Sequence, residues 1–66
     1  MQVIINGQPH RAAAKMSLAQ AVALLTSAPT GVAAALNGDV VRRAAWDSTS
    51  LTDGDEVEVL TAVQGG

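Results

Sequence analysis

Two Asn-Gly dipeptides constrain the fold of this chain more than any other feature. Each follows a short apolar run: residues 3–5 (VII) precede Asn6-Gly7, and residues 32–36 (VAAAL) precede Asn37-Gly38. Asn and Gly both tolerate a positive φ, so Asn-Gly between apolar runs is the strongest short-range signal for a β-hairpin. The sequence therefore predicts two hairpins. The continuous β-branched run at 3–5 is typical of a central strand covered on both faces.

One helix of about ten residues is predicted between the hairpins. Ser17 and Gln20 have the spacing of a capping box, in which each side chain bonds the other's backbone N–H. Pro29 disfavours helix at the residue before it, which sets the end. One apolar stripe recurs at helical spacing, and a Leu25→Ala change within it is expected to cost about 2–5 kcal/mol. The stripe consists of Leu18, Ala21, Val22 and Leu25.

The remaining strands differ in strength. The first return strand, from Gln8 to about Ala13, is weak because Pro9 cannot donate to a ladder, so it is expected at a sheet edge. The last strand, residues 56–63, follows the Asp53-Gly54 turn and alternates strictly. Alternation places Val57, Val59 and Val63 on one face, and Leu60 and Ala62 on the other beside glutamates.

The order of elements is hairpin, helix, hairpin, turn and final strand. If the last strand inserts beside the first, the result is an α+β fold with a mixed sheet of four to five strands packed on one main helix. This is the β-grasp, the fold of ubiquitin. Residues 1–63 are predicted to form the domain and residues 64–66 a flexible tail. The lone Trp46 is expected to cover the core.

Composition excludes several classes of function. With no cysteine among 66 residues, a disulfide framework, a zinc knuckle and a Cys nucleophile are all ruled out. A net charge of −2 with only four basic residues argues against nucleic-acid binding. No apolar run approaches the roughly 20 residues of a membrane span, and the N-terminus lacks a signal-peptide pattern. His10 stands alone, so no metal site is predicted. A cytoplasmic protein is expected.

The sequence closes on Gly65-Gly66, directly after the alternating strand. Glycine has no Cβ, so such a tail is thin enough to enter a channel that excludes side chains. The reactive group would be the Gly66 carboxylate, with Gln64 and Gly65 threading the channel. Leu60, Ala62 and Val63 are apolar residues next to this tail, and they are predicted to dock it on a partner.

Over its whole length the chain resembles the small sulfur carriers of thiamine biosynthesis, the ThiS type. One departure is Val41-Arg42-Arg43, where members typically carry Val-Pro-Arg, and another is Gln64, where a small residue is common. The residues that carry the resemblance are the Asn37-Gly38 hairpin, Val41, Arg43, Trp46, Leu51, Gly54-Asp55, the alternating strand and Val63-x-Gly65-Gly66.

The resemblance implies a carrier rather than an enzyme. In this family the terminal glycine is adenylated with ATP by a ubiquitin-activating-type enzyme, so ATP is used by the partner and no cofactor is bound. A cysteine desulfurase mobilises the sulfur that converts the glycyl adenylate to a thiocarboxylate, and thiazole synthase receives it. The resemblance thus implies 1-thioglycine at Gly66.

Three alternatives use the same residues differently. The chain could be the small subunit of molybdopterin synthase, which uses the same tail chemistry. It could be a ubiquitin-like modifier whose Gly66 forms isopeptide bonds with lysines. The third alternative is a structural β-grasp domain with inert terminal glycines.

Overall fold

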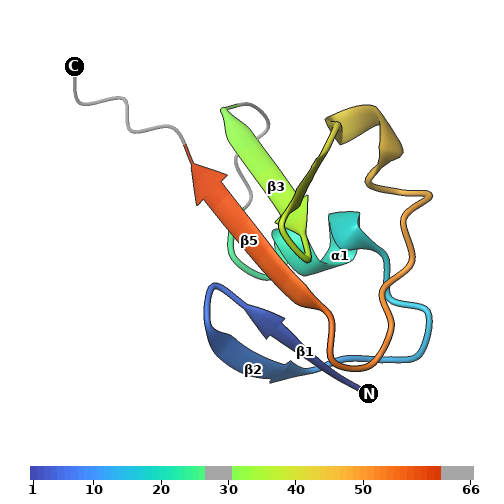
Figure 1. Ribbon diagram of the computed structural model, residues 1–66. Helices are drawn as coiled ribbons and strands as arrows, with labels where there is room; N and C mark the ends of the chain where they lie inside the picture. The colour runs from blue at the N-terminus through green and yellow to red at the C-terminus, as the bar shows by residue number, and fades with distance from the viewer. Residues whose placement is uncertain (27–30, 62–66) are drawn as a thin grey trace.

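The computed structural model describes residues 1–26 and 31–61, which form one mixed sheet with a helix packed on one face (Figure 1). The sheet has five strands in the order β2-β1-β5-β3-β4. A single turn of 3-10 helix, η1, precedes the loop into β5. The elements are β1 (Gln2–Ile5), β2 (Gln8–Arg11), α1 (Leu18–Ala23), β3 (Val32–Leu36), β4 (Asp39–Val41), η1 (Arg43–Ala45) and β5 (Glu56–Thr61).

β5 lies at the centre of the sheet, and it is next to β1 as the sequence predicts. It runs parallel to β1, with Ile4 opposite Glu56. It runs antiparallel to β3, with Val32 opposite Thr61. The two hairpins extend the sheet outward from these central strands, and α1 covers one face (Figure 1). This arrangement confirms the predicted β-grasp.

Both Asn-Gly turns form as predicted, and their backbone angles explain the sequence. Asn6 and Gly7 have φ of 50° and 81°, and Asn37 and Gly38 have φ of 50° and 89°. Two consecutive positive φ values define the type I′ turn, whose twist matches that of the flanking strands. The weak strand β2, which contains Pro9, is an edge strand as expected.

β1 is central, but it is covered on one face only. Val3 and Ile5 are buried beneath α1, whereas Ile4 is half-buried on the opposite face, which is called the open face below. The prediction that both faces are covered was therefore wrong. A three-residue β-branched run does not distinguish a strand covered on both faces from one whose middle residue faces partly outward.

The helix is shorter than the sequence predicts. The Ser17–Gln20 capping box is present, with Gln20 N–H donating to Ser17 Oγ at 3.1 Å and Ser17 N–H to Gln20 Oε1 at 2.9 Å. However, α1 ends at Ala23, and the N–H of Leu25 bonds Val22 O, three residues back. This tighter turn takes Leu25 off the buried stripe and leaves it 43% exposed. The expected cost of 2–5 kcal/mol for Leu25→Ala was thus assigned to the wrong leucine.

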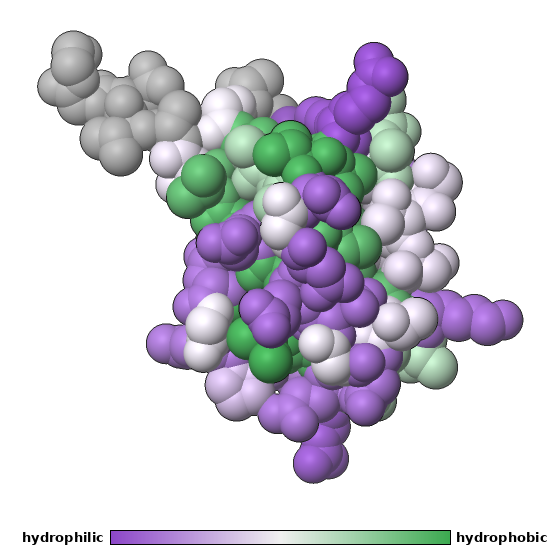
Figure 2. All heavy atoms as spheres, viewed as in Figure 1, coloured by the Kyte–Doolittle hydropathy of each residue, from purple (hydrophilic) through white to green (hydrophobic). Residues whose placement is uncertain are grey.

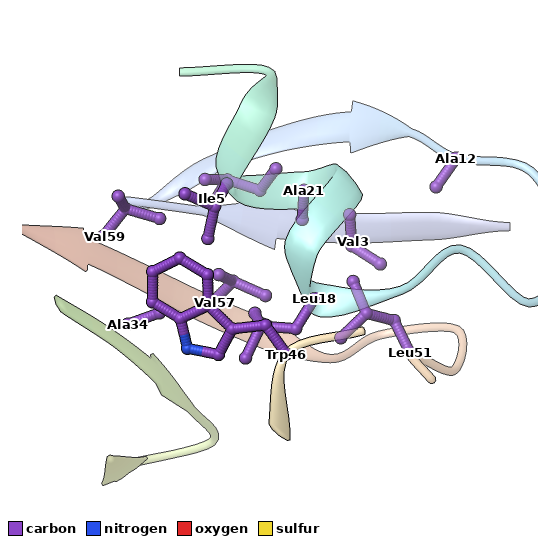
Figure 3. Packing of buried hydrophobic residues seen from close by; sticks show 11 residues of the cluster. Val3, Ile5, Ala12, Leu18, Ala21, Ala34, Trp46, Leu51, Val57 and Val59 are labelled. Carbon is purple, nitrogen blue, oxygen red and sulfur yellow. The ribbon is translucent and has the colours of Figure 1, made fainter. Parts of the chain in front are cut away.

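The core lies between α1 and the covered face of the sheet (Figure 3). Trp46 closes it from the loop side, as predicted, and is 6% exposed. Its indole N–H donates to Val41 O at 2.8 Å, and the Arg43 guanidinium lies 5.3 Å from the ring centroid. The buried residues are Val3, Ile5, Ala12, Leu18, Ala21, Val22, Ala34, Trp46, Leu51, Val57 and Val59.

Arg42 is the residue at which the resemblance implies a proline, and its backbone has a conformation that suits either residue. Its φ of −64° and ψ of 145° are values that proline also adopts. The residue caps η1, whose last N–H, at Trp46, bonds Arg43 O. Arginine can therefore replace proline here without changing the path of the chain into Trp46.

Candidate functional site

The candidate site is the end of β5, where the central strand leads into the tail. Val57 and Val59 are buried against the core, and Leu60 is 70% exposed on the open face. The predicted alternation of this strand is therefore confirmed as far as Thr61, where β5 ends. The other residues assigned to the site lie outside the described residues: Ala62, Val63, Gln64, Gly65 and Gly66.

Leu60 belongs to an apolar patch on the open face of the sheet. Val40 is 81% exposed on β4, and Ala33 pairs with Leu60 across the β3–β5 ladder. Two shallow hollows, of about 240 and 360 Å³, adjoin these residues, and Leu60 and Ala33 line both of them. Figure 2 shows this apolar surface over β3 and β5, near the end of β5. We call Ala33, Ala35, Val40 and Leu60 the sheet patch.

The sheet patch has an acidic border. Glu58 lines the smaller hollow together with Leu60 and Val40. By alternation Glu56 lies on the same open face, and both glutamates are exposed. A partner that covers the patch would therefore meet an apolar centre with negative charge beside it, which favours a partner surface with basic residues at the matching place.

Two asparagine side chains bond to β5, one at its first residue and one at Val59, a role the sequence did not indicate. Asn37 Oδ1 accepts from Glu56 N–H at 2.9 Å, at the start of the strand. Asn6 Oδ1 accepts from Val59 N–H at 2.8 Å, and its Nδ2 donates to Val59 O at 3.2 Å. The Asn-Gly pattern predicts the turns, but it carries no signal for contacts that span 19 and 53 residues of sequence.

Asp55 joins the second hairpin to the turn before β5. Its carboxylate accepts from Thr52 N–H at 2.8 Å, from the Thr52 hydroxyl at 3.1 Å and from Asn37 Nδ2 at 3.1 Å. The Thr52 backbone N–H, followed by the Asn37 amide, holds the pKa of Asp55 below its ordinary value of 3.8. The ionised carboxylate is therefore the form that the fold prefers.

This preference predicts a pH-dependent contribution to stability. Because the pKa is lower in the folded state, the contribution is complete above pH 3.8 and is lost as the pH falls through the folded-state value. Asp55→Asn should melt at a lower temperature than the wild type at neutral pH, and the difference should shrink under acid conditions. Thermal melts of both proteins, from neutral pH to below pH 3.8, measure this difference in melting temperature. A difference that stays constant into acid would show that the charge of Asp55 is unimportant.

Other features of the surface do not point to a second site. A hollow of about 610 Å³ lies beside Met1, Gln2, Pro9 and Arg11, at the end of the sheet opposite to the sheet patch. Among residues 1–26 and 31–61, no three His, Asp or Glu side chains are grouped closely enough to hold a metal ion. No helix in these ranges is long and apolar enough to cross a membrane.

The chain matches the model of one protein family, the ThiS family, over residues 3–66. The chain belongs to the ThiS family. It is therefore a ThiS-type sulfur carrier of thiamine biosynthesis, in agreement with the resemblance seen in the sequence.

Similar proteins agree with membership of the ThiS family. The chain is 29% identical to the sulfur carrier protein ThiS of Escherichia coli, and the match spans all of both chains. It is 35% identical to a thiazole synthase of Magnetococcus marinus, but it spans only 20% of that protein. The crystal structure of the thiamine biosynthesis protein ThiS of Geobacter metallireducens has 35% identity, a TM-score of 0.79 and full coverage of both chains. The solution structure of a thiamine biosynthesis protein from the same organism matches with a TM-score of 0.80. The match covers 88% of that protein.

Proposed function

We propose that this ThiS-family chain carries sulfur as a thiocarboxylate on Gly66. The observation that carries the proposal is the placement of β5. The strand is fixed at the centre of the sheet, ends at Thr61 beside an exposed apolar patch and continues in sequence to Gly65-Gly66. The chain is thus a substrate that partners modify, and it is not itself the catalyst.

The proposed chemistry has two steps. A carboxylate is a poor electrophile, so a Gly66 oxygen first attacks the α-phosphate of ATP and pyrophosphate leaves. In the second step a persulfide sulfur attacks the glycyl carbonyl, and AMP leaves with the oxygen that it holds. A thiol of the sulfur donor then breaks the S–S bond of this acyl persulfide, which releases the thiocarboxylate and leaves the donor as a disulfide. Since the chain has no cysteine, the carried sulfur would be bonded to the Gly66 carbonyl carbon. An adenylating enzyme supplies the ATP site, so the carrier needs no cofactor of its own.

We infer three partners in the cytoplasm. An adenylating enzyme of the ubiquitin-activating type carries out the first step, and a cysteine desulfurase provides the sulfur. Thiazole synthase accepts it. Support for thiazole synthase comes from the Magnetococcus protein of that name, one fifth of which matches this chain.

Mass spectrometry of the chain isolated from its host tests the proposal. The expected product carries one sulfur in place of one oxygen at Gly66. A branched peptide in which Gly66 is bonded to a lysine would instead indicate a protein modifier. A chain that remains unmodified when its host is starved of thiamine would contradict the carrier proposal.

We also propose that the sheet patch, together with Ala62 and Val63, docks the adenylating enzyme. Leu60→Asp should raise the half-saturating carrier concentration in ATP–pyrophosphate exchange by about tenfold or more, because burying one leucine stabilises an interface by about 1.5–3 kcal/mol. Its stability should change little, since Leu60 is 70% exposed.

Leu24→Asp provides the matched control for this docking prediction. Leu24 is 53% exposed at the end of α1, away from the sheet patch, and the change has the same chemistry. The control should bind like the wild type. If Leu60→Asp also binds like the wild type, the patch is not the docking surface. If Leu60→Asp unfolds the domain, Leu60 contributes to the core.

A further inference from the structure

The pairing of β5 on its β1 side ends before the strand does. Among the described residues, the last main-chain hydrogen bond on this side runs from Asn6 N–H to Val57 O at 2.9 Å. The chain then turns away through Gly7, while β5 continues to Thr61. On its other side, β3 pairs with β5 from Leu36 opposite Val57 to Val32 opposite Thr61. The last residues of β5 therefore extend beyond the main-chain pairing on the β1 side (Figure 1).

The side chain of Asn6 supplies the next rung of the ladder. Its Oδ1 accepts from Val59 N–H at 2.8 Å and its Nδ2 donates to Val59 O at 3.2 Å. A carboxamide offers one acceptor and donors in the same plane, as a peptide group does, so it can pair with both main-chain groups of one residue. The side chain thus continues the β1 pairing two residues beyond Val57.

The position of this rung links it to the tail. Val59 is the last buried residue of β5, and Leu60 and Thr61 after it are exposed. We propose that Asn6 is a positioning residue: its side chain fixes the direction in which β5 leaves the sheet, and so where the Gly66 carboxylate is presented to the adenylating enzyme. This inference rests on the proposed carrier function.

The turn alone does not require this side chain. Glycine also suits the first position of a type I′ turn, so a Gly-Gly hairpin keeps the backbone conformation. Asn37 offers a matched comparison because it has the same φ of 50° in the same kind of turn. Its side chain bonds the start of β5, at Glu56, instead of Val59. Asn6→Gly therefore removes two side-chain bonds to Val59, whereas Asn37→Gly removes one bond to Glu56 N–H and one to the Asp55 carboxylate.

The first measurement is NMR relaxation of the backbone amides, made well below the melting temperature of each variant. Asn6→Gly should lower the order parameters of Leu60 and Thr61 from the rigid range, about 0.85, toward about 0.6. Asn37→Gly should leave the order parameters of Leu60 and Thr61 unchanged, although this variant is less stable than the wild type. Equal order at Leu60 and Thr61 in Asn6→Gly and the wild type would overturn the inference, whatever the activity of the chain.

The second measurement is ATP–pyrophosphate exchange with the adenylating enzyme. Because misplacing reacting groups by 1 Å can cost about a hundredfold in rate, partial loss of direction in Asn6→Gly should lower the rate at saturating carrier by about tenfold. The half-saturating concentration should change less than twofold, since the sheet patch is intact. Asn6→Asp, which keeps the acceptor for Val59 N–H, should recover part of the rate.

The outcomes separate this inference from the proposed function. A wild-type chain that supports no exchange would contradict the proposed function, while the relaxation measurement would still decide whether Asn6 orders the end of β5. If Asn37→Gly slows the saturated rate as much as Asn6→Gly does, general destabilisation explains both effects and Asn6 has no positioning role.

Discussion

Replacing Gly65 with alanine should leave the melting temperature unchanged and reduce adenylate and thiocarboxylate formation by about a hundredfold. Gly65 precedes Gly66, whose carboxylate is the proposed reacting group. A partner channel has to be narrowest there if the carboxylate is to meet the α-phosphate of ATP. An added methyl group would clash with the channel or restrict φ, and either effect displaces the reacting atoms.

Two measurements on one sample test the Gly65→Ala prediction. Thermal melting reports the fold, and mass spectrometry after incubation with the adenylating enzyme, a sulfur source and ATP reports the product. Gln64→Ala is the control, since it shortens a side chain one residue farther from the carboxylate, and it should keep most of the activity. Wild-type product on Gly65→Ala would mean that the tail does not enter a fitted channel.

Leu18→Ala should cost about 2–5 kcal/mol of folding free energy, because the side chain is fully buried in the core. Leu18 is fully buried at the first turn of α1 and lies in the core with Trp46 and Leu51 (Figure 3). Removing its side chain leaves a cavity that the short helix and the sheet cannot close. A domain of this length has about 3–10 kcal/mol of stability, so much of it would be lost.

Urea denaturation of Leu18→Ala and Leu25→Ala separates the two leucines. Leu25 is 43% exposed beyond the end of α1, so its variant should lose less than about 1 kcal/mol. Equal losses would mean that Leu25 packs in the core after all. A loss below about 1 kcal/mol for Leu18→Ala would mean that the core can repack around the smaller residue.

The sequence predicted those features of the fold that depend on near neighbours. The Asn-Gly turns, the edge position of the Pro9 strand and the alternation of β5 each follow from φ preferences, a missing N–H or a period of two. The capping box at Ser17 likewise required residues only three apart. The order of the elements also predicted that the last strand lies beside the first, but it did not give the pairing of β3 with β5.

Features that depend on distant parts of the chain were missed. The length of α1 is decided by how its last turn packs, and helical spacing alone continued it to Leu25. Half-burial of Ile4 depends on what lies over the open face. The bonds from Asn6 and Asn37 to β5 require the finished sheet. In the candidate site, the alternation of β5 predicted that Leu60 is exposed. The other residues of the sheet patch could not be predicted, because they lie beside Leu60 only through the pairing of β3 with β4 and β5.

The central position of β5 has a consequence for how the protein is made. β1 and β3 are synthesised early, but each lacks its shared neighbour until residues 56–61 have left the ribosome. Valines from this strand fill the middle of the core, so a nascent chain that stops earlier lacks both its central pairing and much of its apolar interior. Pairing between strands far apart in the sequence also makes folding slower. Chains that lack residues 56–61 are therefore expected to be open to proteolysis, because the central strand of the sheet is missing.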